Sequence, residues 1–288
     1  MKADFLLNVG AELSEGTVWD EKQQVLYWID ISGKKLHCYT PQTDKDRCYD
    51  LGQMVGMCCL TKQGDILVAL EKEIRLLHNW KEESVLTRIE NDNINNRYND
   101  GKCDAKGRLW IGTMNKQSQR GEAAFYCLQP SGNMNKVFDH VTISNGIAWS
   151  PDNKYLYYVD TPSGFLWRFD FNLETGTLEN KIALIDYREE KGDFDGITVD
   201  AQGTIWACHW GGFQVSRWDP NTGKKIDHIE LPVPNVTCCC FGGSNMNQLF
   251  ITTGMGVDKT IKTNYPESGS LYICEADVYG LPAGRFGI

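Results

Sequence analysis

Two stretches decide the fold: NDGKCDAKGRLWIGT, which runs from Asn99 to Thr113, and DGITVDAQGTIWACH, which runs from Asp195 to His209. They align without a gap. Each opens with a polar residue, reaches an aspartate five positions later, turns through Ala-x-Gly and enters an apolar strand. Self-similarity of this kind is the signature of a repeat architecture, so the rest of the chain is compared with the same frame.

The frame recurs as EGTVWDEKQQVLYWID from Glu15 and as NGIAWSPDNKYLYYVD from Asn145. Weaker copies are GMCCLTKQGDILVAL from Gly56 and TCCCFGGSNMNQLFITT from Thr237. The first residues of the six copies are separated by 41, 43, 46, 50 and 42 positions. We call these six positions the register residues: Glu15, Gly56, Asn99, Asn145, Asp195 and Thr237.

The units indicate short strands rather than helices. They are rich in Val, Ile, Trp and Tyr, they are joined by Asp, Asn, Gly and Pro turns, and they lack a 3.6-residue apolar period. We therefore predict an all-β, six-bladed β-propeller with four antiparallel strands in each blade, forming a single domain over residues 1–288. An opening strand near residues 4–9 is expected to pair with the last blade, around residues 249–274. The fixed Gly-His and Trp-Asp offsets of WD repeats are missing, and support for a kelch repeat is thin.

The composition argues against nucleic-acid-binding, membrane and disulfide-rich secreted proteins. Of the 288 residues, 41% are hydrophobic and 23% are charged, and the formal net charge of −9 disfavours nucleic acid as a partner. We find no apolar run long enough for a membrane helix and no signal peptide, so we expect a cytoplasmic protein away from membranes. The eleven cysteines lack paired Cys-x-x-Cys spacing and are expected to be reduced core residues.

The register residues carry the predicted chemistry. Innermost strands of a propeller line its central channel, so equivalent positions of different blades converge at one height. Glu15, Asn99, Asn145 and Asp195 would then bring two carboxylates and two carboxamides into one small space, and such oxygen ligands suit a divalent cation. Any one of these residues alone would more often be a turn former, and a polar channel mouth can also be hydrated without function.

A second set of positions lies where the second strand of each blade returns to the same face. These residues either form the walls of a pocket or bond neighbouring loops, and the sequence leaves both alternatives open. Catalytic motifs of other classes are absent: the chain has no His-Glu-x-x-His helix, no phosphate-binding glycine loop and no Gly-x-Ser-x-Gly elbow. The positions concerned are Asp30, Leu70, Thr113, Asp160, His209 and Thr253.

Several of these blocks together resemble the family of senescence marker protein (regucalcin), gluconolactonases and luciferin-regenerating enzyme. The resemblance rests on LSEGTVWD around Glu15, RYNDGKCDAKGRLWIGTM from Arg97, SNGIAWSPD around Asn145, FDGITVDAQGTIWACHWGG around Asp195, and CCCFGG near the C-terminus. It covers essentially the whole chain. It implies a metal-dependent lactonase in which Glu15, Asn145 and Asp195 bind the ion and Asp195 also transfers the proton.

The resemblance further implies that Arg97 and Asn99 bind a small lactone, such as an aldonolactone. After Gly-Thr-Met the family often has glutamates that hold a gluconolactone-like substrate, whereas this chain has Asn115-Lys116-Gln117. We take Gln117 as a substrate contact, with Lys116 and Arg120 as further candidates on an exposed loop. The departure concerns the preferred lactone more than the reaction.

The metal is left open among Ca²⁺, Zn²⁺, Mn²⁺, Mg²⁺ and Fe²⁺, since oxygen ligands accept each of them to a different degree. The protein is expected to be a monomer or a weak homo-oligomer. Two alternatives to the lactonase remain. One is a non-catalytic, calcium-binding regulatory propeller in which the ion only joins the blades, and the other is a metal-dependent hydrolase of another ester or of a luciferin-type, nitrile or organophosphate substrate.

Overall fold

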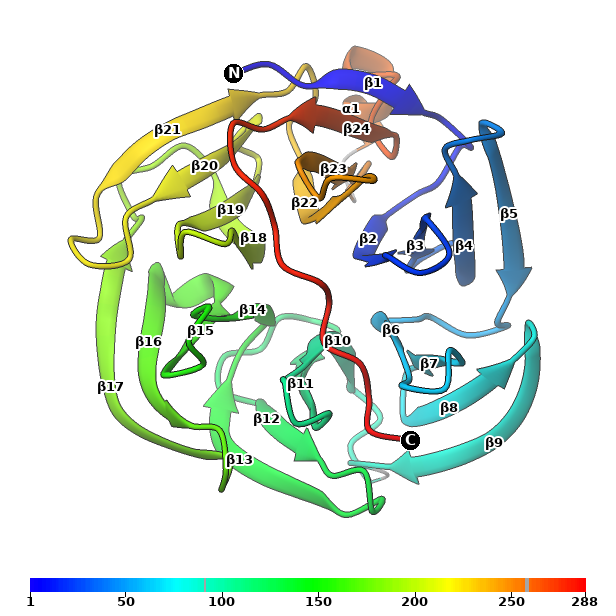
Figure 1. The fold of residues 1–288 in the computed structure, drawn as a ribbon, viewed down its shortest axis with the longest axis vertical. Coiled ribbons are helices and arrows are strands. Elements are labelled where there is room, and N and C mark those ends of the chain that lie inside the picture. Colours follow the sequence, from blue (N-terminus) through cyan, green and yellow to red (C-terminus); the bar gives the residue numbers. More distant parts are fainter. Residues whose placement is uncertain (91, 257–258) are drawn as a thin grey trace.

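The computed structural model describes residues 1–90, 92–256 and 259–288. Six four-stranded antiparallel sheets are arranged radially around one axis, which confirms the predicted six-bladed propeller (Figure 1). In five blades the strands follow one another in chain order, from the innermost strand at the axis to the outermost strand at the rim.

The first three blades contain the following strands: β2 (Ser14–Asp20), β3 (Val25–Asp30), β4 (Lys35–Thr40) and β5 (Lys45–Asp50); β6 (Met57–Leu60), β7 (Ile66–Ala69), β8 (Glu73–His78) and β9 (Lys81–Arg88); β10 (Asn96–Cys103), β11 (Leu109–Asn115), β12 (Ala123–Leu128) and β13 (Met134–Val141). The next two contain β14 (Ser144–Trp149), β15 (Tyr155–Asp160), β16 (Phe165–Asn172) and β17 (Thr177–Asp186); β18 (Asp193–Val199), β19 (Ile205–Trp210), β20 (Gln214–Trp218) and β21 (Lys225–Glu230).

The sixth blade closes the ring. It combines β22 (Val236–Gly242), β23 (Gln248–Thr253) and β24 (Leu271–Glu275) with the first strand of the chain, β1 (Asp4–Leu7), which pairs with β24. The predicted union of the two ends of the chain in one sheet is therefore confirmed (Figure 1). Two short helices, the 3₁₀ helix η1 (Thr161–Ser163) and α1 (Lys259–Asn264), lie in connections between strands.

The gapless alignment of the third and fifth blades has a physical cause. Asp104 accepts backbone N–H bonds within its turn and also accepts the indole N–H of Trp110 at 2.8 Å. Asp200 repeats this arrangement and accepts the indole N–H of Trp206 at 2.9 Å. Each aspartate therefore ties its turn to a fully buried tryptophan of the following strand, which fixes the spacing of the repeat.

The core lies between the blades. Inner and second strands such as β3 are buried along their whole length, because neighbouring blades cover both of their faces, whereas the rim strand β5 is largely exposed. Hydrophobic clusters join residues of adjacent blades, for example Val18 and Leu36 of the first blade with Leu60 and Val68 of the second. All eleven cysteines are free thiols, and most of them are buried, as expected. Among the described residues, no helix is long and apolar enough to cross a membrane.

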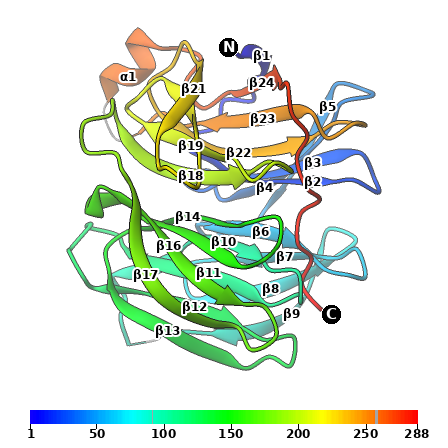
Figure 2. The same cartoon turned by 60° about the vertical axis from the view of Figure 1, so that its left-hand side comes forward.

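The residues after β24 form a C-terminal segment, 276–288, that runs across one end of the ring (Figures 1 and 2). It bonds the turns that follow the inner strands: Phe286 N donates to Leu60 O at 2.7 Å, and Gly287 N donates to Gly107 O at 3.0 Å. Arg285 also pairs with Asp20 at 2.8 Å. Since the register residues lie at the beginnings of the inner strands, this segment covers the opposite end of the channel.

Candidate metal and substrate site

Five of the six inner strands have a β-bulge at or next to the register residue, and β6 pairs with β7 without one. In β2, β10, β14, β18 and β22, three residues of the inner strand span the distance that two residues span on the neighbouring strand. In β18, for example, Phe194 pairs with His209 and Ile197 pairs with Ala207, so Asp195 lies inside the bulge. Bulges bend a strand and redirect its side chains, which explains how one register position becomes a site.

Glycines next to the register residues let the inner strands approach closely. A Cβ on Gly146 would lie 2.7 Å from the carbonyl oxygen of Asp195, and a Cβ on Gly196 would lie 2.8 Å from that of Thr237. Side chains at these positions would push the blades apart. The Asn-Gly and Asp-Gly pairs therefore serve the packing of the ring as well as its polar lining.

A chain of hydrogen bonds fixes three of the predicted residues. Arg97 Nη1 donates to Asn99 Oδ1 at 2.8 Å, and Asn99 Nδ2 donates to Asn145 Oδ1 at 2.7 Å. Asn145 Nδ2 in turn donates to Thr161 Oγ1 at 2.7 Å, so the Asn145 oxygen is held on the side of Asn99. The structure thus brings Arg97, Asn99 and Asn145 into direct contact across two blades.

Two of the predicted residues carry buried carboxyl groups whose proton affinity is unusual. Burial, together with the neighbouring Asp100, raises the pKa of Glu15 to about 8, although Arg97 and Lys102 act in the opposite direction. Burial, Glu15 and Asp100 raise the pKa of Asp195 well above its ordinary value. Glu15 thus adds to the cost of ionising Asp195, and Asp100 adds to the cost of ionising both, which places the three carboxyl groups in one electrostatic cluster at the channel.

Asp100 is a member of this cluster that the sequence reasoning missed. It adjoins Asn99, its Oδ1 accepts the Gly101 N–H at 2.7 Å, and its Oδ2 is buried without a hydrogen-bond partner. Burial also raises the pKa of Asp100. The only indication of this role in the sequence was that Asp100 directly follows the register residue Asn99 in the Asn-Asp-Gly stretch. Only the bulge, however, turns two successive residues of one strand toward the axis, and a bulge is not visible in the sequence.

The residues present fit a divalent cation. One Glu15 oxygen accepts the Gly16 N–H at 2.8 Å, and no hydrogen bond to the Asp195 carboxylate is found among the described residues. Buried carboxylates without a counter-charge are costly, and a cation would remove that cost. Among the described residues, no group of three or more His, Cys, Asp and Glu side chains is placed to hold a metal. An ion held by Glu15 and Asp195 would therefore need a further oxygen donor, such as the Asn145 amide.

The predicted substrate contact Gln117 lies outside this cluster. It is exposed, in the turn after β11, and its backbone N–H donates to Asn115 Oδ1 at 2.9 Å. Its neighbour Lys116 forms an ion pair with Glu71 of the second blade. The same Glu71 contributes to the electrostatic surroundings of Arg97. The loop after β11 thus has a charged connection toward the site, and the role of Gln117 stays a prediction.

The second set of positions bonds loops rather than walling a pocket. Asp30 accepts the backbone N–H groups of Leu13 and Gly33, both at 3.0 Å, and Asp160 accepts that of Ile143 at 2.9 Å. His209 is buried, with its ring nitrogens bonded to Lys191 O and Ser216 Oγ, and burial lowers its pKa to about 4. Of the two alternatives, these contacts favour a structural role.

Comparison with known proteins places the chain in a family. The family model described as the SMP-30/gluconolactonase/LRE-like region matches residues 13–255. Regucalcin of Xenopus laevis is 35% identical over 280 residues, which cover 94% of this chain and 93% of the relative. A solved structure described as a calcium-binding protein, regucalcin, from Agrobacterium tumefaciens is 27% identical, with a TM-score of 0.94 over 100% of this chain and 98% of that one.

A second solved structure, that of a luciferin-regenerating enzyme, is 26% identical, with a TM-score of 0.92 over 99% of both chains. The residues that suggested the resemblance fall within the matched range, from Glu15 in the first blade to Thr237 in the last. Sequence, blade number and overall fold therefore agree, and the chain belongs to the SMP-30/gluconolactonase/LRE-like family.

Proposed function

We propose that this chain hydrolyses small sugar lactones to the corresponding hydroxy acids, with one divalent metal ion held by Glu15, Asn145 and Asp195. One observation carries the proposal. Two buried carboxyl groups with raised pKa values share a channel with an amide oxygen that a neighbouring asparagine holds in place. The gluconolactonase name within the family is consistent with this reaction.

A bound divalent ion supplies Lewis-acid polarisation of the lactone carbonyl. Asp195 accepts the proton of the attacking water as the oxygen–carbon bond forms, and it returns that proton to the ring oxygen that leaves as the alkoxide. The ester C–O bond breaks, and the product is a hydroxy acid.

Arg97 and Asn99 orient the substrate in this proposal. Arg97 Nη1 is occupied by Tyr98 O and Asn99 Oδ1, both at 2.8 Å, and this fixes the guanidinium plane. Its Nη2 and Nε groups make no hydrogen bond to the described residues, so they can donate to sugar hydroxyls or to the carbonyl oxygen. Gln117, on the loop after β11, is assigned a further hydroxyl contact.

The second candidate is a calcium-binding regulatory propeller without catalysis, which the description of the Agrobacterium relative as a calcium-binding protein favours. One experiment distinguishes the lactonase from the calcium-binding regulatory propeller. Purified protein is stripped with EDTA, reloaded with Ca²⁺, Zn²⁺, Mn²⁺, Mg²⁺ or Fe²⁺, and assayed against a panel of aldonolactones with a pH indicator. The lactonase proposal expects hydrolysis above the spontaneous rate with at least one metal and none after EDTA. Metal binding without hydrolysis across the panel would support the regulatory propeller.

A further inference from the structure

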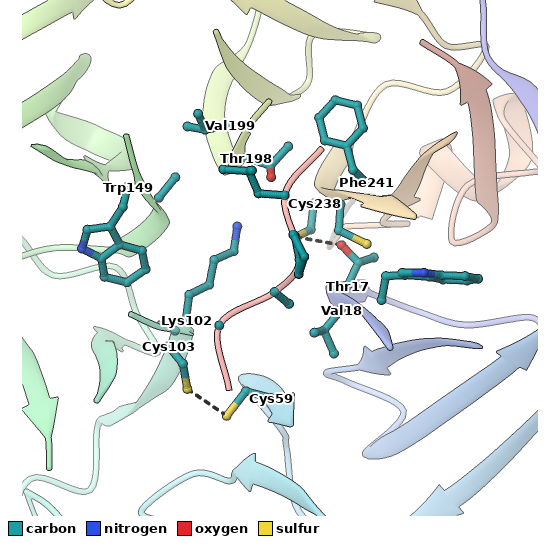
Figure 3. A pocket seen from close by; sticks show the side chains of 18 of the residues that line it. Thr17, Val18, Cys59, Lys102, Cys103, Trp149, Thr198, Val199, Cys238 and Phe241 are labelled. Carbon is teal, nitrogen blue, oxygen red and sulfur yellow. Dashed lines mark hydrogen bonds between the residues drawn. The ribbon is translucent and has the colours of Figure 1, made fainter. Parts of the chain in front are cut away.

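A cavity of about 270 Å³ lies in the other half of the channel, between the inner strands and the C-terminal segment (Figure 3). The metal-site residues do not line it: Glu15, Arg97, Asn99, Asn145 and Asp195 are all absent from its walls. Its floor includes residues 281–284 of the C-terminal segment, whose bonds to the turns after the inner strands hold it in place. Its walls thus differ from the proposed metal ligands, although Asp100, which lines its inner end, also belongs to the electrostatic cluster of Glu15 and Asp195.

The cavity walls are mainly apolar and come from several blades. Val18, Trp149, Val199, Phe241 and Pro282 all contribute side chains, and Figure 3 shows the Val18, Trp149, Val199 and Phe241 side chains grouped around the space. An apolar cavity of about 150 Å³ is enough for a benzene ring. A cavity of this larger size accommodates a bicyclic aromatic body.

One charged group extends into this apolar space. Lys102 of β10 is half-buried, and its side chain projects into the cavity (Figure 3). Its Nζ donates to the carbonyl oxygen of Ile197 on β18 at 2.5 Å. Among the described residues, no carboxylate lies within ion-pair distance of this ammonium group. Two of its three N–H donors are therefore available to an anionic ligand, although its charge also acts on Asp100 and Glu15.

The cavity also contains a carboxyl group, which decides where an anion can bind. Asp100 lines the inner end, but its Oδ1 is taken by the Gly101 N–H, and its Oδ2 is shut off from solvent. Lys102, in contrast, is partly accessible. A ligand carboxylate therefore meets the ammonium group of Lys102, while the apolar body of the ligand packs on Trp149 and Phe241.

We propose that this cavity is a second binding site, which takes a small carboxylate with an aromatic body and uses Lys102 as its ion-pair partner. The inference does not depend on the lactonase reaction, because the two sites share none of their proposed binding residues.

The test is calorimetric titration of the metal-free full-length protein with 1-naphthoate, and with the neutral 1-naphthalenemethanol as the matched probe. We expect 1-naphthoate to bind at least about tenfold more tightly than the neutral probe, which corresponds to about 1.4 kcal/mol for the ion pair. Lys102→Met should abolish this difference. Lys45→Met removes an exposed lysine of the rim strand β5 and should change nothing.

Two further variants keep the test decisive. Ala283→Trp places a large side chain in the C-terminal segment at the cavity wall and should abolish binding of both probes. Arg97→Ala reports on the opposite end of the channel and should leave naphthoate affinity unchanged. The proposal is overturned if the wild type shows no binding at millimolar probe, if Lys102→Met and Ala283→Trp bind like the wild type, or if only Arg97→Ala loses binding. Thermal unfolding of each variant confirms that it is folded.

Discussion

Asn99 Nδ2 lies 2.7 Å from Asn145 Oδ1, so carboxamides from the inner strands of two neighbouring blades are bonded at the mouth of the channel. The bond orients the Asn145 oxygen, which a metal would need, and it uses a donor from a residue proposed to touch substrate. In the proposed function, metal binding and substrate binding would therefore be coupled through one hydrogen bond. Ligands held in this way lose affinity when the supporting partner is removed.

Asn99→Ala should weaken metal binding without removing a proposed ligand. Loss of the orienting bond is expected to lower the affinity for Ca²⁺ or Mn²⁺ by about tenfold or more. Calorimetric titration of the EDTA-stripped protein measures this. Asn133→Ala, in an exposed turn, is the matched control. Equal affinity in Asn99→Ala and wild type would show that Asn145 is oriented by Thr161 alone.

Glu15→Gln should stabilise the metal-free protein at high pH while weakening its metal site. The pKa of Glu15 is raised to about 8 in the folded state. The folded protein therefore holds a proton that the unfolded chain loses near pH 4.5, so stability falls as pH rises from about 4.5 to about 8.

Glutamine carries no ionisable group, so the variant avoids that loss. In EDTA its Tm should exceed that of the wild type by about 4 °C or more at pH 9, and by much less at pH 5. Saturating metal should reverse the order, because only the wild type gains stability from tight binding. A Tm difference that is the same at both pH values would contradict the assignment of the raised pKa to Glu15.

His209 should make the fold sensitive to acid. Burial lowers the pKa of His209 from 6.5 to about 4, so between these values the unfolded chain binds a proton that the folded protein does not. The stabilising effect is present above pH 6.5 and is lost as pH falls toward about 4. His209→Gln should flatten the fall in Tm over this range, whereas His140→Gln, at an exposed site, should follow the wild type. Parallel curves for all three proteins would refute this.

Arg97→Ala should separate substrate binding from metal binding. The guanidinium is proposed to contact the substrate and not the ion, so KM for an active lactone should rise by about tenfold or more. Because Arg97 also bonds Asn99, metal affinity should fall, but by less than in Asn99→Ala. Arg188→Ala, which removes an exposed arginine, should leave both quantities unchanged. If Arg97→Ala loses metal affinity and keeps its KM, Arg97 supports the metal site and does not bind substrate.

The six-bladed architecture could be predicted from the sequence because local hydrogen bonds fix the spacing of the residues in each repeat. Asp104 and Asp200 each accept backbone N–H bonds in their turn and the indole N–H bond of the tryptophan six residues later. The same residue types therefore recur at the same spacing in the sequence. Pairing of β1 with β24 followed from the need to close a ring. The contact of Asn99 with Asn145, and the electrostatic effect of Glu15 on Asp195, agree with equal register positions. Arg97, which bonds Asn99, is not a register residue and was indicated only by the family resemblance.

Other features depend on geometry that no single residue encodes. Asn99 and Asp100 both lie in the β-bulge between Tyr98 and Gly101. The bulge is an extra residue in the pairing of two strands, and no residue type in the sequence indicates it. The path of the C-terminal segment follows backbone bonds to distant turns, such as Phe286 N to Leu60 O. The cavity around Lys102 exists only because that path closes it.

The central claim is that Asp195 both binds the ion and transfers the proton, and turnover by metal-saturated Asp195→Asn tests it most directly. Asparagine keeps the size and one ligand oxygen of aspartate but cannot accept the proton. Tm should stay close to that of the wild type, while lactone turnover falls by at least about 100-fold, the usual cost of losing a general base. Wild-type turnover in a folded, metal-loaded Asp195→Asn would contradict the account.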